Sequence, residues 1–181
     1  DPAGRTWLGC QTIASVVDRL AECERDLNDP DQTLVAWGLD PIFLTGERLV
    51  AKHLDQISTT RPIFVFHASG HLATVNSEMM RRSGIDRHTP TPGVAKDVDG
   101  EPNGELQEPA AMSLAQGGFA AIGVAMMSPN AKWNYAREAR NCGVTTIADL
   151  GTTRLAMEGQ LEAWRQATDD PNYPARVVVA V

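Results

Sequence analysis

The chain has 181 residues, of which 16 are basic and 23 acidic, giving a net charge of −7. Because no run of Lys or Arg forms a basic stripe, a nucleic-acid partner is not expected. The apolar runs, such as residues 63–66 and 177–181, are far shorter than the roughly 20 residues that span a membrane, so we expect a soluble and preferentially cytoplasmic protein. The three cysteines have no CxxC spacing and predict neither a disulfide framework nor a cysteine zinc site.

A helix and a strand are predicted in the first part of the chain. Apolar residues recur at helical spacing over residues 10–27, with charged residues between them, which predicts an amphipathic helix. The apolar run at residues 33–37 is bounded by Gly38 and Pro41 and predicts a strand. Residues 43–60 are expected to form loops and a short helix.

The next predicted strand, residues 62–67, leads into a small turn with a histidine on either side. Ser69 is expected to cap a helix that carries Leu72 and its apolar neighbours and stops at Gly84. Asn76 is expected to tie that helix to the neighbouring backbone. This junction between a strand and a helix is of the kind that can hold a substrate.

A hairpin and two helices are predicted in the middle of the chain. Residues 94–98 and 105–107 flank a segment rich in turn residues, which predicts a hairpin with a loop longer than two residues. One helix is expected to run from Pro109 through Ile122, although its glycines give it a weak helix propensity. A second helix is expected after Pro129 and ends at Gly143.

The last part of the chain predicts a strand, a helix and a strand at residues 144–150, 154–167 and 176–181. The final strand is almost entirely apolar, which suits a parallel sheet covered on both faces. The fold class is therefore predicted to be α/β. A parallel barrel and a doubly wound sheet both remain open at this point.

Polar residues near predicted strand ends are candidates for a functional site. Asp149 lies at the carboxyl end of the strand predicted at residues 144–150. Parallel α/β folds place ligands at such strand ends, but Asp149 could equally cap the next turn or helix. His67 and His71 do not share a helix, so a zinc ion bound by both is not expected. His71 either donates a hydrogen bond to a substrate carbonyl or carboxylate, or satisfies the backbone of its turn.

Glu105 and Glu108 lie at the foot of the predicted hairpin and could hold a cation, although a solvated charge is the ordinary interpretation. Trp37 could form the apolar wall of a pocket, but an aromatic residue after a strand more often belongs to the core. His53 and His88 lie in polar segments and are expected at the surface.

Several sequence blocks occur together in one order: WGLD at residues 37–40, Gly70-His71 followed by VNS at 75–77, DGEPNG at 99–104 leading to Glu108, and GVTT at 143–146. In this order and spacing the chain resembles the metal-dependent amidohydrolases of the branch that includes N-substituted formamide deformylases. No single block is specific, so the resemblance depends on their combination.

The resemblance implies a (β/α)8 barrel with a small β-sandwich and a large insertion after the first barrel strand. It also implies hydrolysis of C–N bonds by a water that one or two divalent metal ions activate. On this basis we expect a partial barrel with an α+β insertion. The helical N-terminal segment is then expected at residues 1–29, the insertion that shapes the substrate pocket at 30–140, and a βαβ unit of the barrel at 141–181.

The resemblance further implies that the metal-binding HxH pair lies before residue 1 and that the later ligands lie after residue 181. The chain is therefore expected to be an internal fragment that is inactive alone and binds no metal tightly, while its parent uses a divalent metal, with zinc preferred. Glu108 is expected near the metal. His71, Trp37 and Asp149 are expected to contact a small amide substrate.

Two alternatives differ in how the chain behaves in solution. A severed barrel would expose the apolar strand at residues 176–181 and self-associate through it. The alternative is a non-catalytic binding or interaction module that folds independently and remains monomeric. The acidic composition and the absence of a complete catalytic constellation in the sequence favour that alternative.

Overall fold

The computed structural model describes residues 9–127, 129–149 and 160–179. These residues form two compact units, a larger unit of residues 9–123 and a smaller unit of residues 124–179. The fold of the chain is mixed α/β, as predicted. Over the described ranges, every helix is too short or too polar to cross a membrane.

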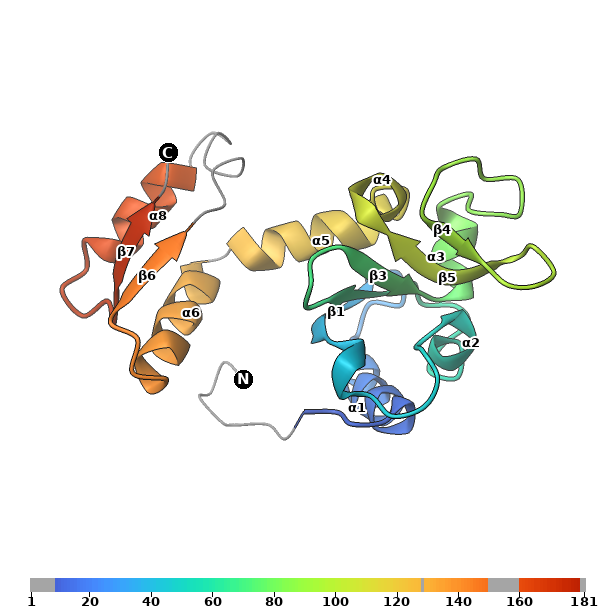
Figure 1. Cartoon of the computed structure of the whole chain (residues 1–181), viewed down its shortest axis with the longest axis horizontal. Coiled ribbons are helices and arrows are strands. Elements are labelled where there is room, and N and C mark those ends of the chain that lie inside the picture. Colours follow the sequence, from blue (N-terminus) through green and yellow to red (C-terminus); the bar gives the residue numbers. More distant parts are fainter. Residues whose placement is uncertain (1–8, 128, 150–159, 180–181) are drawn as a thin grey trace. The chain divides into compact units, whose positions relative to one another are not determined.

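The larger unit is built around a five-stranded sheet with the spatial order β1-β2-β3-β5-β4 (Figure 1). Its strands are β1 (Leu34–Leu39), β2 (Ile63–His67), β3 (Leu72–Val75), β4 (Val94–Lys96) and β5 (Pro102–Gln107). β1 is parallel to β2, and the other neighbouring strands are antiparallel. Its helices are α1 (Ile13–Arg25), the 3-10 helix η1 (Pro41–Phe43), α2 (Ala51–Leu54), α3 (Ser77–Arg82), α4 (Glu108–Met112) and the first part of α5 (Gln116–Met127).

The β2 strand is buried along its whole length because helices cover both faces of the sheet. Helices α1 and α2 lie on one face of the sheet (Figure 1), and Ile63 and Val65 join a core cluster with residues of these helices. Alternate side chains of a strand point to opposite faces, so Phe64 and Phe66 lie on the other face, where Phe66 meets Phe119 of α5 with ring centroids 6.4 Å apart. The predicted α1, β1 and β2 are confirmed.

The helix predicted to start at Ser69 is wrong. Leu72–Val75 is instead the strand β3, because these residues pair with both β2 and β5. The helix in this segment is α3, and its N-cap is Asn76, whose side chain accepts a hydrogen bond from the Met79 backbone. Short apolar runs fit either a strand or a buried helix, and here tertiary pairing decides.

Asn76 ties α3 to neighbouring backbone, as predicted. Its Oδ1 also accepts from the backbone of Ile63 at 2.9 Å, and its Nδ2 donates to the carbonyls of Ser58 and Arg61 at 2.8 and 2.9 Å. The side chain is fully buried, so these bonds satisfy polar groups that water does not reach. Asn76 thereby joins α3, β2 and the segment that precedes β2.

The predicted hairpin is confirmed as β4 and β5, whereas the helix expected from Pro109 through Ile122 is two helices, α4 and α5. Gly118 has a packing role in α5. A Cβ atom at this position would collide with the ring of Phe64, so Gly allows α5 to approach the sheet closely. Packing on the sheet thus overrides the weak propensity of this helix.

The smaller unit contains α6 (Pro129–Asn141), β6 (Thr146–Asp149), α8 (Gln160–Thr168) and β7 (Arg176–Val179). β6 and β7 are parallel and adjacent, with a helix between them in sequence, which confirms the predicted βαβ order. Residues 150, 154–159 and 180–181 of the predicted elements lie outside the described residues. The expected cover on both faces of the last strand is not seen, because β7 alternates between exposed and half-buried positions.

Candidate functional site

One end of the sheet in the larger unit gathers the candidate residues of that unit. The carboxyl ends of the parallel strands β1 and β2 lie together, and His67 is the last residue of β2. The chain then turns back into β3, where Leu72 pairs with Gln107 of the antiparallel β5. His71 and Glu108 are the next residues on these two strands, so the sheet register brings them side by side at the same end.

His71 and Glu108 form a direct pair. The Nδ1 atom of His71 lies 3.0 Å from Oε2 of Glu108, and the backbone amide of Glu108 donates to the carbonyl of His71 at 2.8 Å. The side chains are 67% and 65% exposed, so both are open to a ligand. Sequence reasoning named both residues but assigned them separate roles and did not predict their contact.

Glu108 has an unusual backbone conformation. Its φ of +66° is the one positive value among the non-glycine residues that the structure describes. Left-handed backbone costs a residue with a Cβ about 1 kcal/mol or more and tends to occur at functional sites. The position of Glu108 next to His71 is therefore held by its surroundings against a local preference.

His67 lies below the surface at the same end of the sheet. Its side chain is buried, and Nε2 lies 2.9 Å from Oγ1 of Thr74. Burial lowers the pKa of His67 to about 4, while the nearby carboxylate of Glu105 acts in the opposite direction. Its Nδ1 has no hydrogen-bond partner among the described residues. His67 is therefore a neutral residue of the core at physiological pH.

Glu105 is not the solvated carboxylate that the sequence suggests. Its side chain is only 6% exposed and accepts from Nη2 of Arg48 at 2.6 Å and from Nε2 of Gln107 at 2.7 Å. Arg48 lies 57 residues away in sequence, and no sequence signal marked this partner. Because both carboxylate oxygens of Glu105 accept hydrogen bonds, Glu105 stabilises this end of the sheet. Glu108 is the exposed carboxylate at the same end.

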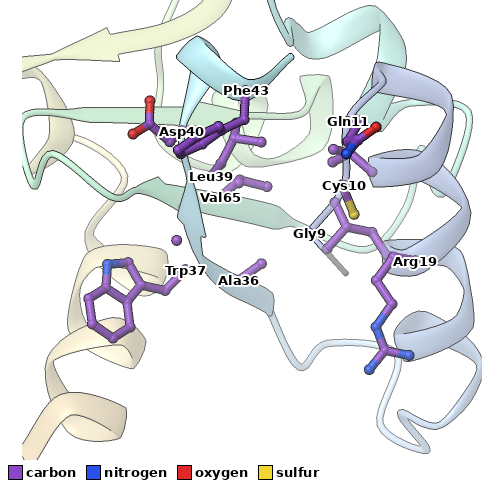
Figure 2. A pocket seen from close by; sticks show the side chains of 13 residues that line it. Gly9, Cys10, Gln11, Arg19, Ala36, Trp37, Leu39, Asp40, Phe43 and Val65 are labelled. Carbon is purple, nitrogen blue, oxygen red and sulfur yellow. The ribbon is translucent and has the colours of Figure 1, made fainter. Parts of the chain in front are cut away.

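A cavity of about 460 Å³ opens beside β1, within the size range of small-molecule pockets (Figure 2). Trp37 lines it and is 64% exposed, so the alternative that this indole belongs to the core is wrong. β1 is an edge strand of the sheet, which leaves Trp37 without cover. The other lining residues come from β1, β2, η1 and α1 with the residues just before it: Gly9, Cys10, Gln11, Val16, Arg19, Leu20, Ala36, Gly38, Leu39, Asp40, Phe43 and Val65.

The other two histidines differ in their surroundings. His88 is exposed, as predicted, but His53 is buried, so its predicted surface position is wrong. The Nδ1 atom of His53 accepts from the backbone of Val50 at 3.1 Å, and its Nε2 lies 3.2 Å from Oε1 of Glu47. His53 therefore fixes the start of α2 and has no open coordination position.

Asp149 is the last residue of β6, the position that the sequence predicted. It belongs to the smaller unit, as does Lys132, which is buried and lies 5.3 Å from the ring centroid of Trp164. Burial lowers the pKa of Lys132, and the charge of Asp149 acts in the opposite direction. Asp149 is thus in electrostatic contact with a buried cation of its own unit.

A complete metal site is not formed by the residues that the structure describes, since no three His, Cys, Asp or Glu side chains converge. His71 and Glu108 supply two suitable donor groups at one place. A catalytic zinc site usually has three protein ligands. These residues therefore do not by themselves fit a bound catalytic metal ion.

Comparison with known proteins links the chain to several longer proteins. The chain is 31% identical to YtcJ of Bacillus subtilis, a protein described as an amidohydrolase, over 53% of this chain and 19% of that protein. It is 32% identical to LONG AFTER FAR-RED 3 of Arabidopsis thaliana, over 64% of this chain and 20% of that protein. It is 38% identical to the N-substituted formamide deformylase of Arthrobacter pascens, over 34% of this chain and 12% of that protein. The matched segments thus span about a fifth or less of these relatives.

A solved structure supports the fold. An uncharacterized metal-dependent hydrolase from Pyrococcus horikoshii OT3 matches 96% of this chain and 32% of its own with a TM-score of 0.50 and 18% identity. The sequence model of the Amidohydrolase family matches residues 4–180, which is almost the entire chain. The resemblance expected from the sequence blocks is therefore confirmed, and the chain belongs to the amidohydrolase family.

Proposed function

We propose that this chain is the pocket-forming part of a hydrolase that cleaves the C–N bond of an amide or formamide. The observation that carries the proposal is the cavity of about 460 Å³ beside β1, which Trp37 lines. A concave site of this size is the usual form of a small-molecule pocket. His71 and Glu108 meet separately where β3 begins and β5 ends, at the end of the sheet that also carries the carboxyl end of β2. The family membership makes hydrolysis the reaction to test first.

In the proposed whole enzyme, β6 and β7 are early strands of a (β/α)8 barrel, and residues 30–140 form the insertion over its active site. A divalent ion, with zinc preferred, would supply an activated water and polarise the scissile carbonyl. Its ligands come mainly from outside the described residues. Within this chain, Glu108 lies near that ion, and His71, Trp37 and Asp149 contact the substrate.

The roles differ among these residues. Trp37 offers an exposed indole to the apolar part of a substrate, and His71 offers an exposed imidazole to its polar part. Asp149 lies at a strand end in the smaller unit, the position at which barrel enzymes carry their active-site groups. Each role is a proposal that a single substitution can test in the longer enzyme.

The test is an assay of the longer polypeptide that contains this segment, with N-substituted formamides and the matching acetamides as substrates. We expect hydrolysis that a chelator abolishes and zinc restores, and no hydrolysis by the 181-residue chain under the same conditions. Trp37→Ala is expected to raise KM, while Val98→Ala, at a fully exposed position, should leave it unchanged. Hydrolysis that is insensitive to chelation, or turnover by the isolated chain with added zinc, would contradict the proposal.

A non-catalytic binding module is the second candidate function, and the cavity beside β1 would be its ligand site. The two candidates differ in self-association. The barrel proposal leaves the edge of β7 uncovered in the isolated chain, where Val178 is 53% exposed. Light scattering that shows a monomer at high concentration, together with absent hydrolysis by the longer polypeptide, would favour the binding module.

A further inference from the structure

The contact between His71 and Glu108 determines which ring nitrogen of His71 carries the proton. We propose that Glu108 is a positioning residue that holds neutral His71 with its proton on Nδ1, so that Nε2 accepts a hydrogen bond from a substrate N–H. This inference rests on the proposed function for the identity of the substrate, but not for the state of the ring. It reverses the expectation from sequence that neutral His71 donates to a carbonyl or carboxylate.

The direction of the hydrogen bond follows from the chemistry of the two groups. An ionised carboxylate can only accept, so at 3.0 Å the Nδ1 atom must be the donor. A neutral imidazole has one donor and one acceptor nitrogen, which leaves the lone pair on Nε2. No described residue bonds to Nε2, and the side chain is 67% exposed, so this lone pair is accessible.

The sheet, more than the side-chain hydrogen bond, holds the two residues together. Interactions between exposed polar side chains contribute less than about 1 kcal/mol by themselves. Here the backbone amide of Glu108 bonds to the carbonyl of His71, and the amide of His71 bonds to Oγ of Ser69 at 3.2 Å. Both backbones are therefore fixed before the side chains meet, which lowers the entropy lost when the pair forms.

The backbone of Glu108 supports a role beyond packing. Gly would adopt a φ of +66° without strain, yet this position carries a glutamate with its side chain 65% exposed. An exposed side chain gains little from burial that could offset the strain. The interaction that the exposed side chain of Glu108 makes is its contact with His71.

The chemical class of the ligand follows from the acceptor nitrogen. The N–H of a secondary amide or a primary amide can donate to Nε2, whereas a tertiary amide has no N–H. A carboxylate would be repelled, because its oxygen lone pairs would face the lone pair of Nε2. In the proposed reaction, His71 then orients the amide nitrogen that becomes the leaving amine. Substrates without an N–H are expected to lose this contact.

A second His–Glu pair in the chain provides an internal standard with the opposite proton position. At His53, the backbone of Val50 donates to Nδ1, so its proton lies on Nε2 and faces Glu47. The test is nitrogen-15 NMR of the imidazole rings in the 181-residue chain, at a pH where the signals no longer move. We expect the Nδ1–H form at His71 and the Nε2–H form at His53.

Substitution of Glu108 then tests the cause. Glu108→Gly suits the backbone and removes the carboxylate, and we expect His71 to lose the Nδ1–H preference while His53 is unchanged. Glu47→Gln is the matched control, because Val50 still fixes His53 and no change at His71 is expected. An Nε2–H form at His71 in the unaltered chain, or an Nδ1–H form that persists in Glu108→Gly, would overturn the inference.

The ligand class is tested by titration with N-methylformamide and N,N-dimethylformamide. We expect the first to shift the Nε2 signal of His71 more than the second, with no such difference at exposed His88. Equal responses, or none, would overturn the assignment of an N–H donor. Failure of the proposed function would instead appear as absent hydrolysis by the longer enzyme with the proton position at His71 unchanged.

Discussion

The larger and smaller units differ in how completely they bury their own sheets. In the larger unit, β2 is buried at every position and core residues lie on both of its faces. In the smaller unit, β6 and β7 form a two-stranded sheet in which Val178 is 53% exposed. Ile147 of β6 is 6% exposed, so the smaller sheet is packed on one face only, whereas a sheet packed on both faces buries more apolar surface. The comparison indicates that the larger unit can organise its site residues from its own contacts.

A buried charged group contributes to the specific packing of the larger unit. In the larger unit Arg61 is 6% exposed, pairs with Glu24 at 2.9 Å and donates to the carbonyls of Leu27 and Gln32. Such bonds are stabilising only when their geometry is fixed, because a buried charge without partners is costly. They therefore indicate one specific packing of the larger unit.

The largest expected effect is the loss of the Asn76 side chain. In Asn76→Ala, the amide groups of Ile63 and Met79 and two carbonyls lose their buried partners. We expect the free energy of unfolding of the larger unit to fall by about 3 kcal/mol or more, measured by urea denaturation. Asn130→Ala, at an exposed position of the smaller unit, should change it by less than about 0.5 kcal/mol.

The next effect is a pH dependence from His67. Burial lowers its pKa to about 4 from an ordinary 6.5, so the unfolded chain binds the proton more readily than the folded one between these values. The stabilising effect of the neutral ring is present above pH 6.5 and is lost as the pH falls towards 4, by up to about 3 kcal/mol. Denaturation at several pH values should show this slope, and His67→Gln should remove it.

A control and a contrary result separate His67 from the other ionisable groups. His88→Gln should leave the slope unchanged because His88 is exposed. If the slope between pH 4 and 6.5 persists in His67→Gln, then His67 is not the buried neutral ring that the structure shows.

A smaller effect is expected from relief of backbone strain at Glu108. Glu108→Gly should keep or raise the free energy of unfolding, by up to about 1 kcal/mol, because Gly adopts the positive φ freely. Thermal unfolding would measure the change. Glu101→Gly, at a position without positive φ, should lower stability slightly, and a similar loss in both variants would argue against strain at Glu108.

The smallest effect on stability is expected at Val178 in the smaller unit. Because the side chain is 53% exposed, Val178→Lys should change the free energy of unfolding by less than about 0.5 kcal/mol. The same change should reduce self-association through the edge of β7, as measured by light scattering. Val98→Lys, at a fully exposed position of the larger unit, should leave self-association unchanged.

The sequence was sufficient where local patterns decide the structure. The helical spacing in α1 and the apolar run of β2 predicted both elements, and the turn residues predicted the hairpin of β4 and β5. The prediction failed where distant pairing decides, since Leu72–Val75 fits a helix or a strand until β5 lies beside it. Local propensity cannot contain that information.

The candidate site shows the same division. The sequence named His71 and Glu108 from their residue types, but their contact spans 37 positions and depends on the register of β3 and β5. It left open whether Trp37 lines a pocket or belongs to the core, because it could not show that β1 is an edge strand. The contacts between these residues thus depend on sheet pairing, which the sequence alone does not contain.

Segment-resolved hydrogen exchange of the 181-residue chain tests the contrast between the units most directly. We predict that amides of β2, β3 and β5 exchange only through global unfolding of the larger unit, and that amides of β6 and β7 exchange much faster through local opening. Equal protection of both sheets, or faster exchange in the larger unit, would contradict the account that the larger unit alone is a self-sufficient body holding His71 and Glu108 in place.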